Sequence, residues 1–418
     1  MAGEVDFGIK GMEAFDYRGK TVLLRLDINS TLHPETKRIV SENRINMSIP
    51  TIQYILDQNA KLVIIAHQGD TLDYENLIPM TEHAKKLSDK LGITVQYVDD
   101  VAGPAAQDAI KNLEPGEAVL LGNLRYLTEE ISTFENSVKL EPDQMLGTYL
   151  VRNIAPLVDY YVNDAFSAAH RNAPSMVAFQ ELLPTAGGLL MMKELSALTK
   201  VMTCPEKPSI FVLGGAKISD AFGMMKQVLE NGSADKILAC GVTGNIMLMA
   251  SGYSISKPTE KFIKDRSLDV FIEPAKTYLT KYPGKIIFPV DLAYEENGQR
   301  REVDMKDLPV EAPLFDIGSK TIAVFAEEIR KAGTIFVNGP AGVYEKEVFE
   351  KGTKEIWKAI AEAKGYSVIG GGDTVSAAQK FIDIKNIGYV CTAGGAMVQF
   401  LSGEEMPLIK AMKKASRK

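Results

Sequence analysis

Short, continuous apolar runs separated by longer helical segments limit the folds open to this chain more than any other feature of its sequence. The runs lack alternation of apolar and polar residues, which is typical of strands covered on both faces. Strand, helix and strand in repetition predict an α/β protein with doubly wound, Rossmann-like parallel sheets and right-handed connections. The predicted strands are Thr21–Leu26, Leu62–Ala66, Val119–Leu121, Tyr160–Val162, Ile210–Leu213, Lys236–Ala239, Ile286–Pro289, Thr334–Val337 and Ser367–Ile369. Predicted helices include Pro79–Leu91 and Phe349–Ala363.

The predicted strands fall into two groups, over residues 1–180 and 205–400, which favours two domains in a chain of 418 residues. Between the groups, a segment that starts at Pro184 repeats apolar residues at helical spacing as far as Thr203. We predict a helix over 184–203 that bridges the two domains. The alternative is an ordinary surface helix of one large domain.

Composition and charge exclude several classes of protein. The chain has 47 Lys and Arg against 54 Asp and Glu, a formal charge of -7, which argues against a generic nucleic-acid binder. Its cysteines, Cys204, Cys240 and Cys391, lie far apart without a CxxC spacing, so zinc and disulfide frameworks are not expected. No apolar run approaches about 18 residues and the N-terminus resembles no secretory signal. We expect a cytoplasmic protein without nucleic-acid or membrane partners.

Glycine-rich turns follow four predicted strands in the second half of the chain. The carboxyl ends of parallel strands are where such sheets bind ligands, and glycine amides at the start of a helix bind phosphate oxygens. One such turn would be explained by packing, since glycine also closes strand-to-helix turns. Four of them favour phosphate binding. The turns are Leu213–Lys217, Asn338–Gly342, Gly370–Thr374 and Thr392–Ala396.

Two charged residues within these turns are typical of nucleotide sites. Lys217 ends the first turn, where an ammonium group can reach a phosphate. Asp373 follows three glycines, where its carboxylate could hold Mg²⁺ on a nucleotide. A plain helix N-cap is the alternative for Asp373, and both roles can coexist.

The first half of the chain lacks these turns and has polar side chains just beyond its strand ends. Together they predict an anion site in which Asp27 and Asn29 orient hydroxyl groups. Taken singly, each arginine is an ordinary surface charge and His67 a hydrogen-bonded, partly buried histidine. The residues are Arg25, Asp27, Asn29, Arg44, His67, Arg125, His170 and Arg171.

These residues, in this order, resemble the phosphoglycerate kinase family over nearly the whole chain. VNDAFSAAHR, and NGPAGVYE together with GGGDT, are the most specific motifs, and AHQG is more similar to archaeal members. The matching motifs are RLDIN from Arg25, ENRI with Arg44, AHQG from Ala66, NLRY from Asn123, VNDAFSAAHR from Val162, LGGAKISD from Leu213, PVDLAY from Pro289, VNGPAGVYE from Val337, GGGDT from Gly370 and CTAGGA from Cys391.

The resemblance implies a hinge-bending kinase of glycolysis and gluconeogenesis, either monomer or homodimer. It would transfer phosphate reversibly between ATP and the carboxylate of 3-phosphoglycerate, giving 1,3-bisphosphoglycerate and ADP. Residues 1–183 would bind the acid, 184–203 would be the hinge helix and 204–400 would bind ATP or ADP with Mg²⁺. The tail, 401–418, would pack back toward the first domain.

The resemblance also implies a role for each matched residue. Phosphoryl transfer needs placement and charge neutralisation, which cationic side chains and helix N-termini supply. The implied catalytic residues are Arg44, Lys217, Gly372 and Gly395. The implied acid-binding residues are Asp27, Asn29, Arg44, His67, Arg125 and Arg171. The implied nucleotide-binding residues are Gly214, Gly215, Lys217, Gly241, Asn338, Glu345, Gly371, Gly372, Asp373 and Thr374, with Asp373 also on the metal.

One departure from the family concerns the acid site. Asp70 stands after AHQG, where the family usually has Arg or Lys. A carboxylate about 4 Å from a phosphate costs about 4 kcal/mol per unit charge at an effective dielectric constant of 20. That cost corresponds to a loss of affinity of roughly a thousandfold. Either Asp70 turns away, leaving Arg125 and Arg171 to suffice, or the substrate is a different small acid.

Smaller departures lie elsewhere. Gly122 replaces a glutamate of the family, Ser30–Thr31 replaces a proline and should loosen its loop, and Ala221–Phe222 replaces a second lysine found in bacterial members. In place of a three-glycine turn, Ala239–Gly241 should narrow the nucleotide-base pocket. Two alternatives stay open, a carboxylate kinase for another acid and a catalytically silent nucleotide-binding paralogue. A dinucleotide dehydrogenase is disfavoured because no GxGxxG motif opens the first strand-to-helix unit.

Overall fold

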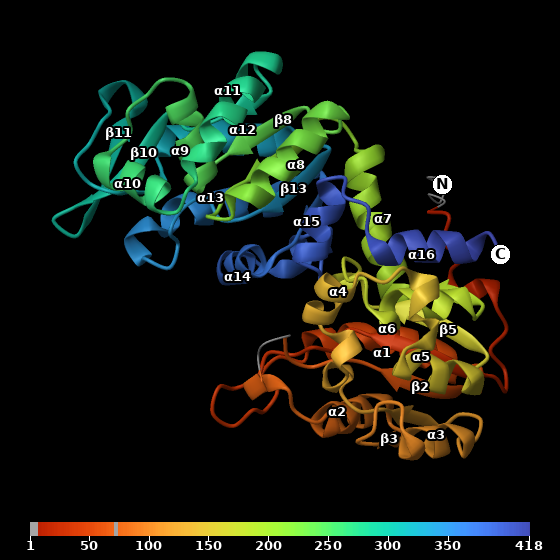
Figure 1. Cartoon of the computed structure of the whole chain (residues 1–418). Helices are drawn as coiled ribbons and strands as arrows, with labels where there is room; N and C mark the ends of the chain where they lie inside the picture. The colour runs from red at the N-terminus through yellow and green to blue at the C-terminus, as the bar shows by residue number, and fades with distance from the viewer. Residues whose placement is uncertain (1–6, 71–73) are drawn as a thin grey trace. The chain divides into compact units, whose positions relative to one another are not determined.

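Two six-stranded parallel sheets organise this computed structural model, which describes residues 7–70 and 74–418 (Figure 1). The chain divides into an N-terminal unit, Met1–Ser196 with Glu405–Lys418, and a C-terminal unit, Ala197–Glu404. Each sheet lies in one unit. The predicted α/β class with parallel sheets is confirmed.

The sheet of the N-terminal unit has the strand order β3-β4-β2-β1-β5-β6. Its strands are β1 (Thr21–Leu26), β2 (Lys61–Ile65), β3 (Val95–Tyr97), β4 (Ala118–Leu120), β5 (Tyr160–Asp164) and β6 (Thr185–Gly187). The unit's helices are α1 (Asn43–Leu56), α2 (Thr81–Leu91), α3 (Pro104–Lys111), α4 (Ser132–Val138), α5 (Tyr149–Ile154), α6 (Pro174–Val177) and α16 (Pro407–Ser416).

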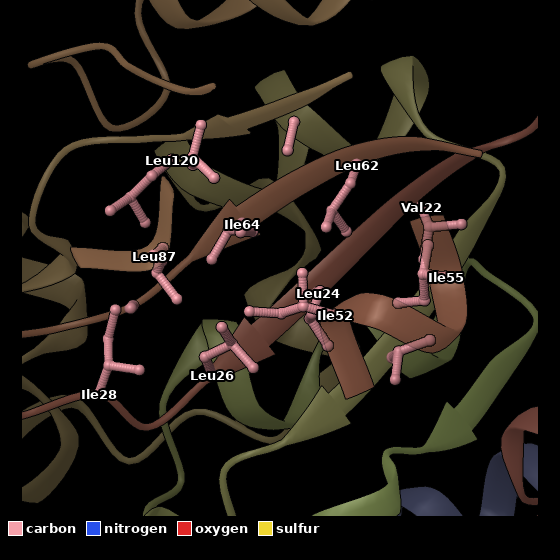
Figure 2. Packing of buried hydrophobic residues seen from close by; sticks show 14 of the residues in the cluster. Val22, Leu24, Leu26, Ile28, Ile52, Ile55, Leu62, Ile64, Leu87 and Leu120 are labelled. Atoms are coloured by element: carbon pink, nitrogen blue, oxygen red, sulfur yellow. The ribbon is translucent and has the colours of Figure 1, made fainter. Parts of the chain in front are cut away.

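The core of this unit shows why its strands read as continuous apolar runs. Figure 2 shows Leu24 and Leu26 of β1 beside Ile52 of α1, and all three belong to one buried cluster. Leu23, which points to the opposite face of β1, is also fully buried. Both faces of the central strand are therefore covered, as the unbroken apolar pattern predicts.

The sheet of the C-terminal unit has the order β15-β14-β13-β7-β8-β9. Its strands are β7 (Ser209–Leu213), β8 (Lys236–Ala239), β9 (Ile286–Ile287), β13 (Thr334–Asn338), β14 (Tyr366–Ile369) and β15 (Tyr389–Val390). The unit's helices are α8 (Ile218–Glu230), α9 (Gly241–Ala250), α10 (Lys257–Asp265), α11 (Ile272–Lys281), α12 (Ser319–Lys331), α13 (Glu350–Glu362), α14 (Gly372–Phe381) and α15 (Gly395–Leu401). Helix α7 (Leu189–Thr203) carries the chain from one unit to the other.

The bridging helix was predicted to start at Pro184, and this start is wrong. Residues 185–187 form β6, which pairs with β5 through Thr185 and Tyr161, and the helix starts at Leu189. Gly188 explains the break, because a Cβ there would lie 2.3 Å from Asp164 Oδ1. The Asp164 carboxylate instead accepts the Met191 N–H at the start of α7, at 2.9 Å.

A three-stranded antiparallel sheet in the C-terminal unit was not predicted. It has the order β11-β10-β12 and consists of β10 (Asp291–Glu296), β11 (Gln299–Asp304) and β12 (Leu314–Ile317). The outer strand β11, QRREVD, is polar and has no fully buried residue, so it lacks the apolar run that marks the other strands. The predicted strand Ile286–Pro289 is also shorter, since β9 ends at Ile287.

Candidate functional site

The carboxyl ends of β1, β2, β4 and β5 gather the predicted acid-binding residues in the N-terminal unit. The Arg44 guanidinium donates to Asp27 Oδ2 at 2.5 Å, and the Ser167 hydroxyl donates to the same oxygen. Burial alone would raise the pKa of Asp27, but Arg44, the hydrogen bond from Ser167 and Arg25 outweigh it and hold that pKa at about 2. Asp27 is therefore an ionised carboxylate, able to accept a hydroxyl donor.

Hydrogen bonds fix the loop that carries Asn29. Its side-chain oxygen accepts the Gly69 N–H at 3.1 Å, which joins the loops after β1 and β2. Ser30 donates its N–H to Gln68 Oε1 at 2.8 Å, and the Gln68 amide donates back to the Ser30 carbonyl at 3.0 Å. These bonds oppose the loosening expected of Ser30–Thr31, because the Ser30 N–H makes a bond that proline could not.

Basic side chains are concentrated and incompletely paired in this site. Arg171 Nε donates to Glu135 at 2.7 Å, yet Arg171 Nη2 and His170 Nδ1 are buried without a hydrogen-bond partner among the described residues. Burial, with Arg171 and Arg25 close by, lowers the pKa of Arg125 to about 10. A buried guanidinium N–H without a partner, as on Arg171, is rare unless a ligand satisfies it. The cluster is thus suited to an anion.

Asp70 lies at the margin of this cluster. It is exposed, and its negative charge acts on Arg125 in the direction that raises the pKa of the guanidinium. The carboxylate is therefore near enough to the basic cluster to subtract from the positive potential there. Because Asp70 is exposed, solvent and salt screen this effect.

The predicted nucleotide-binding residues come together in the walls of two adjoining cavities of the C-terminal unit. The larger, of about 380 Å³, has a mostly apolar wall that includes Val242, Phe262 and Leu314. The smaller, of about 140 Å³, is lined by all four glycine turns. Gly241 and Glu345 line the larger cavity, Gly215 and Asp373 line both, and the smaller is lined by Gly214, Lys217, Asn338, Gly371, Gly372, Thr374 and Gly395.

The glycines of these turns are present for two different reasons. A Cβ on Gly214 or Gly339 would lie 2.3 Å from a carbonyl oxygen of the other turn, so those two glycines allow the turns to pack together. A Cβ on Gly372 or Gly395 would have nothing within 4 Å. Packing therefore does not require glycine at these two helix starts, and the amides of a first helical turn have no partner within the helix.

Polar contacts hold the glycine turns in place. The buried Thr374 hydroxyl accepts the Gly339 N–H at 2.8 Å, and the Asn338 amide donates to the Gly370 carbonyl at 3.2 Å. These bonds tie the turn after β13 to the turn after β14. Thr374 and Asn338 thus shape the smaller cavity as well as lining it.

Two sequence departures in the C-terminal unit can be compared with the structure, and one has a different consequence from the one expected. Cys240 is fully buried, and its sulfur would lie 2.8 Å from a Cβ on Gly214, so the thiol points at the neighbouring turn. Neither Ala239 nor Cys240 lines the larger cavity, and the predicted narrowing by their Cβ atoms is wrong. At the position of the second lysine, Phe222 is buried and its ring lies 4.9 Å from that of Phe271, so this place belongs to the core.

Sequence reasoning missed Asn245, which lines the larger cavity from α9. The residue is 6% exposed, and its Oδ1 is buried without a hydrogen-bond partner among the described residues. An unsatisfied amide in a mostly apolar wall is costly unless a ligand supplies its hydrogen bond. Its position one helical turn after Gly241 was the only sequence signal, and an isolated asparagine in a helix carries no motif.

The comparisons with known proteins agree on one family. A family model described as phosphoglycerate kinase matches residues 12–404. The phosphoglycerate kinase of Methanothermus fervidus is 43% identical over 407 residues, 97% of each chain, and that of Methanothermobacter thermautotrophicus is 40% identical over 411 residues, 98% of each chain. The crystal structure of phosphoglycerate kinase from Pyrococcus horikoshii OT3 has a TM-score of 0.85 and 36% identity, covering 98% of this chain and 99% of that chain.

Within residues 7–70 and 74–418, no helix has both the length and the apolar character that crossing a lipid bilayer requires.

Proposed function

This chain belongs to the phosphoglycerate kinase family, and we propose that its N-terminal unit holds the acid and its C-terminal unit the nucleotide. The activity is phosphoryl transfer from ATP to the carboxylate of 3-phosphoglycerate, which gives 1,3-bisphosphoglycerate and ADP in a reversible step of glycolysis. The observation that carries the assignment of sites is their opposite chemistry. One site is a cluster of basic side chains with an unpaired, buried guanidinium nitrogen on Arg171, and the other is a cavity lined by glycine turns beside a mostly apolar pocket.

In the acid site, each group of the substrate has a complementary side chain. Arg125 and Arg171 would bind the anionic groups of the acid, and the Asp27 carboxylate would accept its hydroxyl proton. Arg44, fixed by Asp27, would neutralise charge on the phosphoryl group during transfer. The geometry needs no covalent intermediate, because placement and charge neutralisation supply most of the catalysis of phosphoryl transfer.

In the nucleotide site, the base would occupy the larger cavity and the phosphates the smaller one. The amide of Gly372 at the start of α14 and the Lys217 ammonium would bind phosphate oxygens. Gly215 and Asp373 line both cavities, so the cavities adjoin and one extended ligand would occupy both.

Mg²⁺ would enter with the nucleotide. Among the described residues, no group of three or more His, Cys, Asp or Glu side chains is placed to hold a metal. Magnesium usually takes one or two carboxylates and completes its shell with phosphate oxygens and water. The exposed Asp373 carboxylate, in the wall of both cavities, fits the role of that single protein ligand. When bound, the ion would neutralise phosphate charge.

Helix α7 is the segment that we assign as the hinge. The chain crosses between the units within it, at Ser196 and Ala197, and crosses back at Glu404 and Glu405. Substrates held on separate units must meet for transfer, and water must be kept from an acyl phosphate while they do. The chain passes between the units at only these two places. A relative movement of the units would therefore need changes in few backbone torsion angles.

A coupled assay tests the activity. Enzyme with 3-phosphoglycerate and Mg-ATP should form an acyl phosphate that glyceraldehyde-3-phosphate dehydrogenase reduces, so that NADH is oxidised only when both substrates are present. Product formation from another small acid but not from 3-phosphoglycerate would overturn the assignment and favour the alternative acid. Nucleotide binding without any acyl phosphate would favour the silent paralogue.

Gly372→Ala is expected to raise KM for ATP about tenfold without lowering the melting temperature. The added methyl group meets no protein atom within 4 Å, but it crowds the amide that would bind a phosphate oxygen, at a cost of about 1.4 kcal/mol. Gly147→Ala is the matched control, since a Cβ there also has open space and lies in the N-terminal unit. An unchanged KM for ATP in Gly372→Ala would show that the start of α14 does not bind a phosphate of the nucleotide.

Asn245→Leu is expected to raise KM for ATP about tenfold with KM for the acid unchanged, because the base loses one hydrogen bond. Steady-state kinetics with each substrate varied in turn measure both constants. Thr243→Val is the control, since Thr243 on the same helix also has a buried, unpartnered oxygen but does not line the cavity. Equal increases in KM for ATP in Asn245→Leu and Thr243→Val would show that Asn245 supports the folded structure and does not bind the base.

A further inference from the structure

Arg25 is a fully buried cation for which the reaction as described has no use. It lies on β1 and is 3% exposed. Its Nε donates to Ser175 Oγ at 3.3 Å, its Nη1 donates to the Leu26 carbonyl, and its Nη2 lies 3.0 Å from His67 Nδ1. Burying a charged side chain carries a large desolvation penalty, so a buried arginine with this many hydrogen bonds calls for an explanation.

The contact between Arg25 and His67 determines where the histidine carries its proton. A guanidinium has five N–H donors and no acceptor, and in proteins it does not lose its proton. His67 Nδ1 must therefore accept with its lone pair. A neutral imidazole carries one proton, so that proton is on Nε2. Burial, with Arg25 beside the ring, lowers the pKa of His67 well below its usual value and keeps the ring neutral at pH 7.

Glu130 and Ser175 hold Arg25 in this orientation. The Ser175 hydroxyl donates to Glu130 Oε2 at 2.6 Å while its oxygen accepts from Arg25, and the Ser175 N–H donates to Glu130 Oε1 at 2.7 Å. Glu130 is 4% exposed, and burial raises the pKa of its carboxyl while Arg25 acts to lower it. In return, Glu130 acts to raise the pKa of Arg25 and so stabilises its charge. Glu130, Ser175 and Arg25 therefore form a buried relay that ends at His67.

The other nitrogen of His67 is left to the acid site. Nε2 is the ring nitrogen that Arg25 does not contact, and Asp27, Arg44 and Arg125 are close enough for their charges to act on the ring. With the proton on Nε2, the ring presents a donor to an anion. With the proton on Nδ1, it would present a lone pair, which repels an anionic oxygen.

We propose that the relay of Glu130, Ser175 and Arg25 locks His67 in the tautomer with the proton on Nε2, so that His67 donates a neutral hydrogen bond to an anionic oxygen of the bound acid. Arg25, Ser175 and Glu130 are positioning residues, since they act through His67. The identity of the acid rests on the proposed function, whereas the tautomer of the free enzyme does not.

The first test is nuclear magnetic resonance of the ligand-free enzyme with ¹⁵N-labelled histidine at pH 7. The chain has only 4 histidines, and the signals that disappear in His67→Asn belong to His67. The ¹⁵N shifts of neutral imidazole separate the two tautomers. A protonated Nε2 and a bare Nδ1 are expected for His67, and the reverse pattern would overturn the lock. Arg25→Gln should populate the other tautomer, because a glutamine oxygen can accept from Nδ1–H.

The second test compares His67→Gln with His67→Asn. The glutamine amide reaches as far as Nε2 and can still donate, whereas the shorter asparagine amide replaces Nδ1. KM for 3-phosphoglycerate should be about tenfold higher in His67→Asn than in His67→Gln, with KM for ATP equal. Equal KM values for the acid would refute donation to the acid. If the spectrum still showed Nε2–H, the lock would stand and the proposed place of the acid would fail.

Discussion

Arg44→Ala is expected to lower kcat about a thousandfold, the loss that follows removal of an arginine that stabilises a transferring phosphoryl group. The affinity for Mg-ADP should not change, because that ligand is assigned to the other unit. Arg44 also pairs with the buried Asp27, so its removal leaves a carboxylate with fewer donors. Stopped-flow or steady-state kinetics give kcat, and fluorescence titration with a labelled ADP gives the affinity.

Arg44→Lys separates charge from geometry in this experiment. A lysine keeps the positive charge but cannot present the planar fork of donors, so we expect an intermediate kcat. If kcat of Arg44→Ala fell by less than tenfold, Arg44 would not act on the transferred phosphoryl group. A large loss of nucleotide affinity in the same variant would show that the units do not divide the substrates as proposed.

Asp70→Arg is expected to lower KM for 3-phosphoglycerate about a hundredfold at low ionic strength, and Asp70→Asn about tenfold. The full Coulomb value of about 4 kcal/mol per charge at 4 Å is an upper bound, because exposure and salt screen the side chain. We therefore assume a screened interaction of about 1.4 kcal/mol per unit of charge changed at this position, which corresponds to a tenfold change in KM per unit charge. Raising the salt concentration should shrink both effects.

Asp57→Asn is the matched control for Asp70→Asn, since it removes one exposed carboxylate from the same unit. Asp57 follows the end of α1, which runs back from the carboxyl edge of the sheet to the start of β2, so it lies far from the acid site. Its KM for the acid should equal that of the parent enzyme. A higher KM for 3-phosphoglycerate in Asp70→Arg would indicate that the natural acid differs and that Asp70 contacts it.

The fold could be predicted wherever burial leaves a pattern in the sequence. β1 and β8 have the predicted bounds because both faces of each are covered and most of their residues are apolar. Strand β11 could not be predicted, since its side chains are mostly exposed and its partner is selected by tertiary pairing. The false start of the bridging helix has a similar cause, because Thr185 joins a sheet edge supplied by distant residues.

Some residues of the candidate site could be predicted from the sequence and others could not, for the same reason. Residues in the glycine turns and the cationic cluster could be predicted, because each stands in a motif at a strand end. Gln68, Ser175 and Asn245 could not, because their importance arises from partners brought close only by folding. A single position also led to a wrong prediction at Cys240. Only the direction of its side chain, which the sequence does not give, decides whether it narrows the pocket.

Hydrogen exchange with each ligand added alone tests most directly whether the two units divide the substrates. With 3-phosphoglycerate, amides in the loops after β1, β2 and β4 should exchange more slowly, and those of 214–217 and 370–374 should not change. With Mg-ADP, the pattern should be reversed. Slower exchange in the loops after β1 and β2 with Mg-ADP alone, together with unprotected glycine turns, would contradict the account.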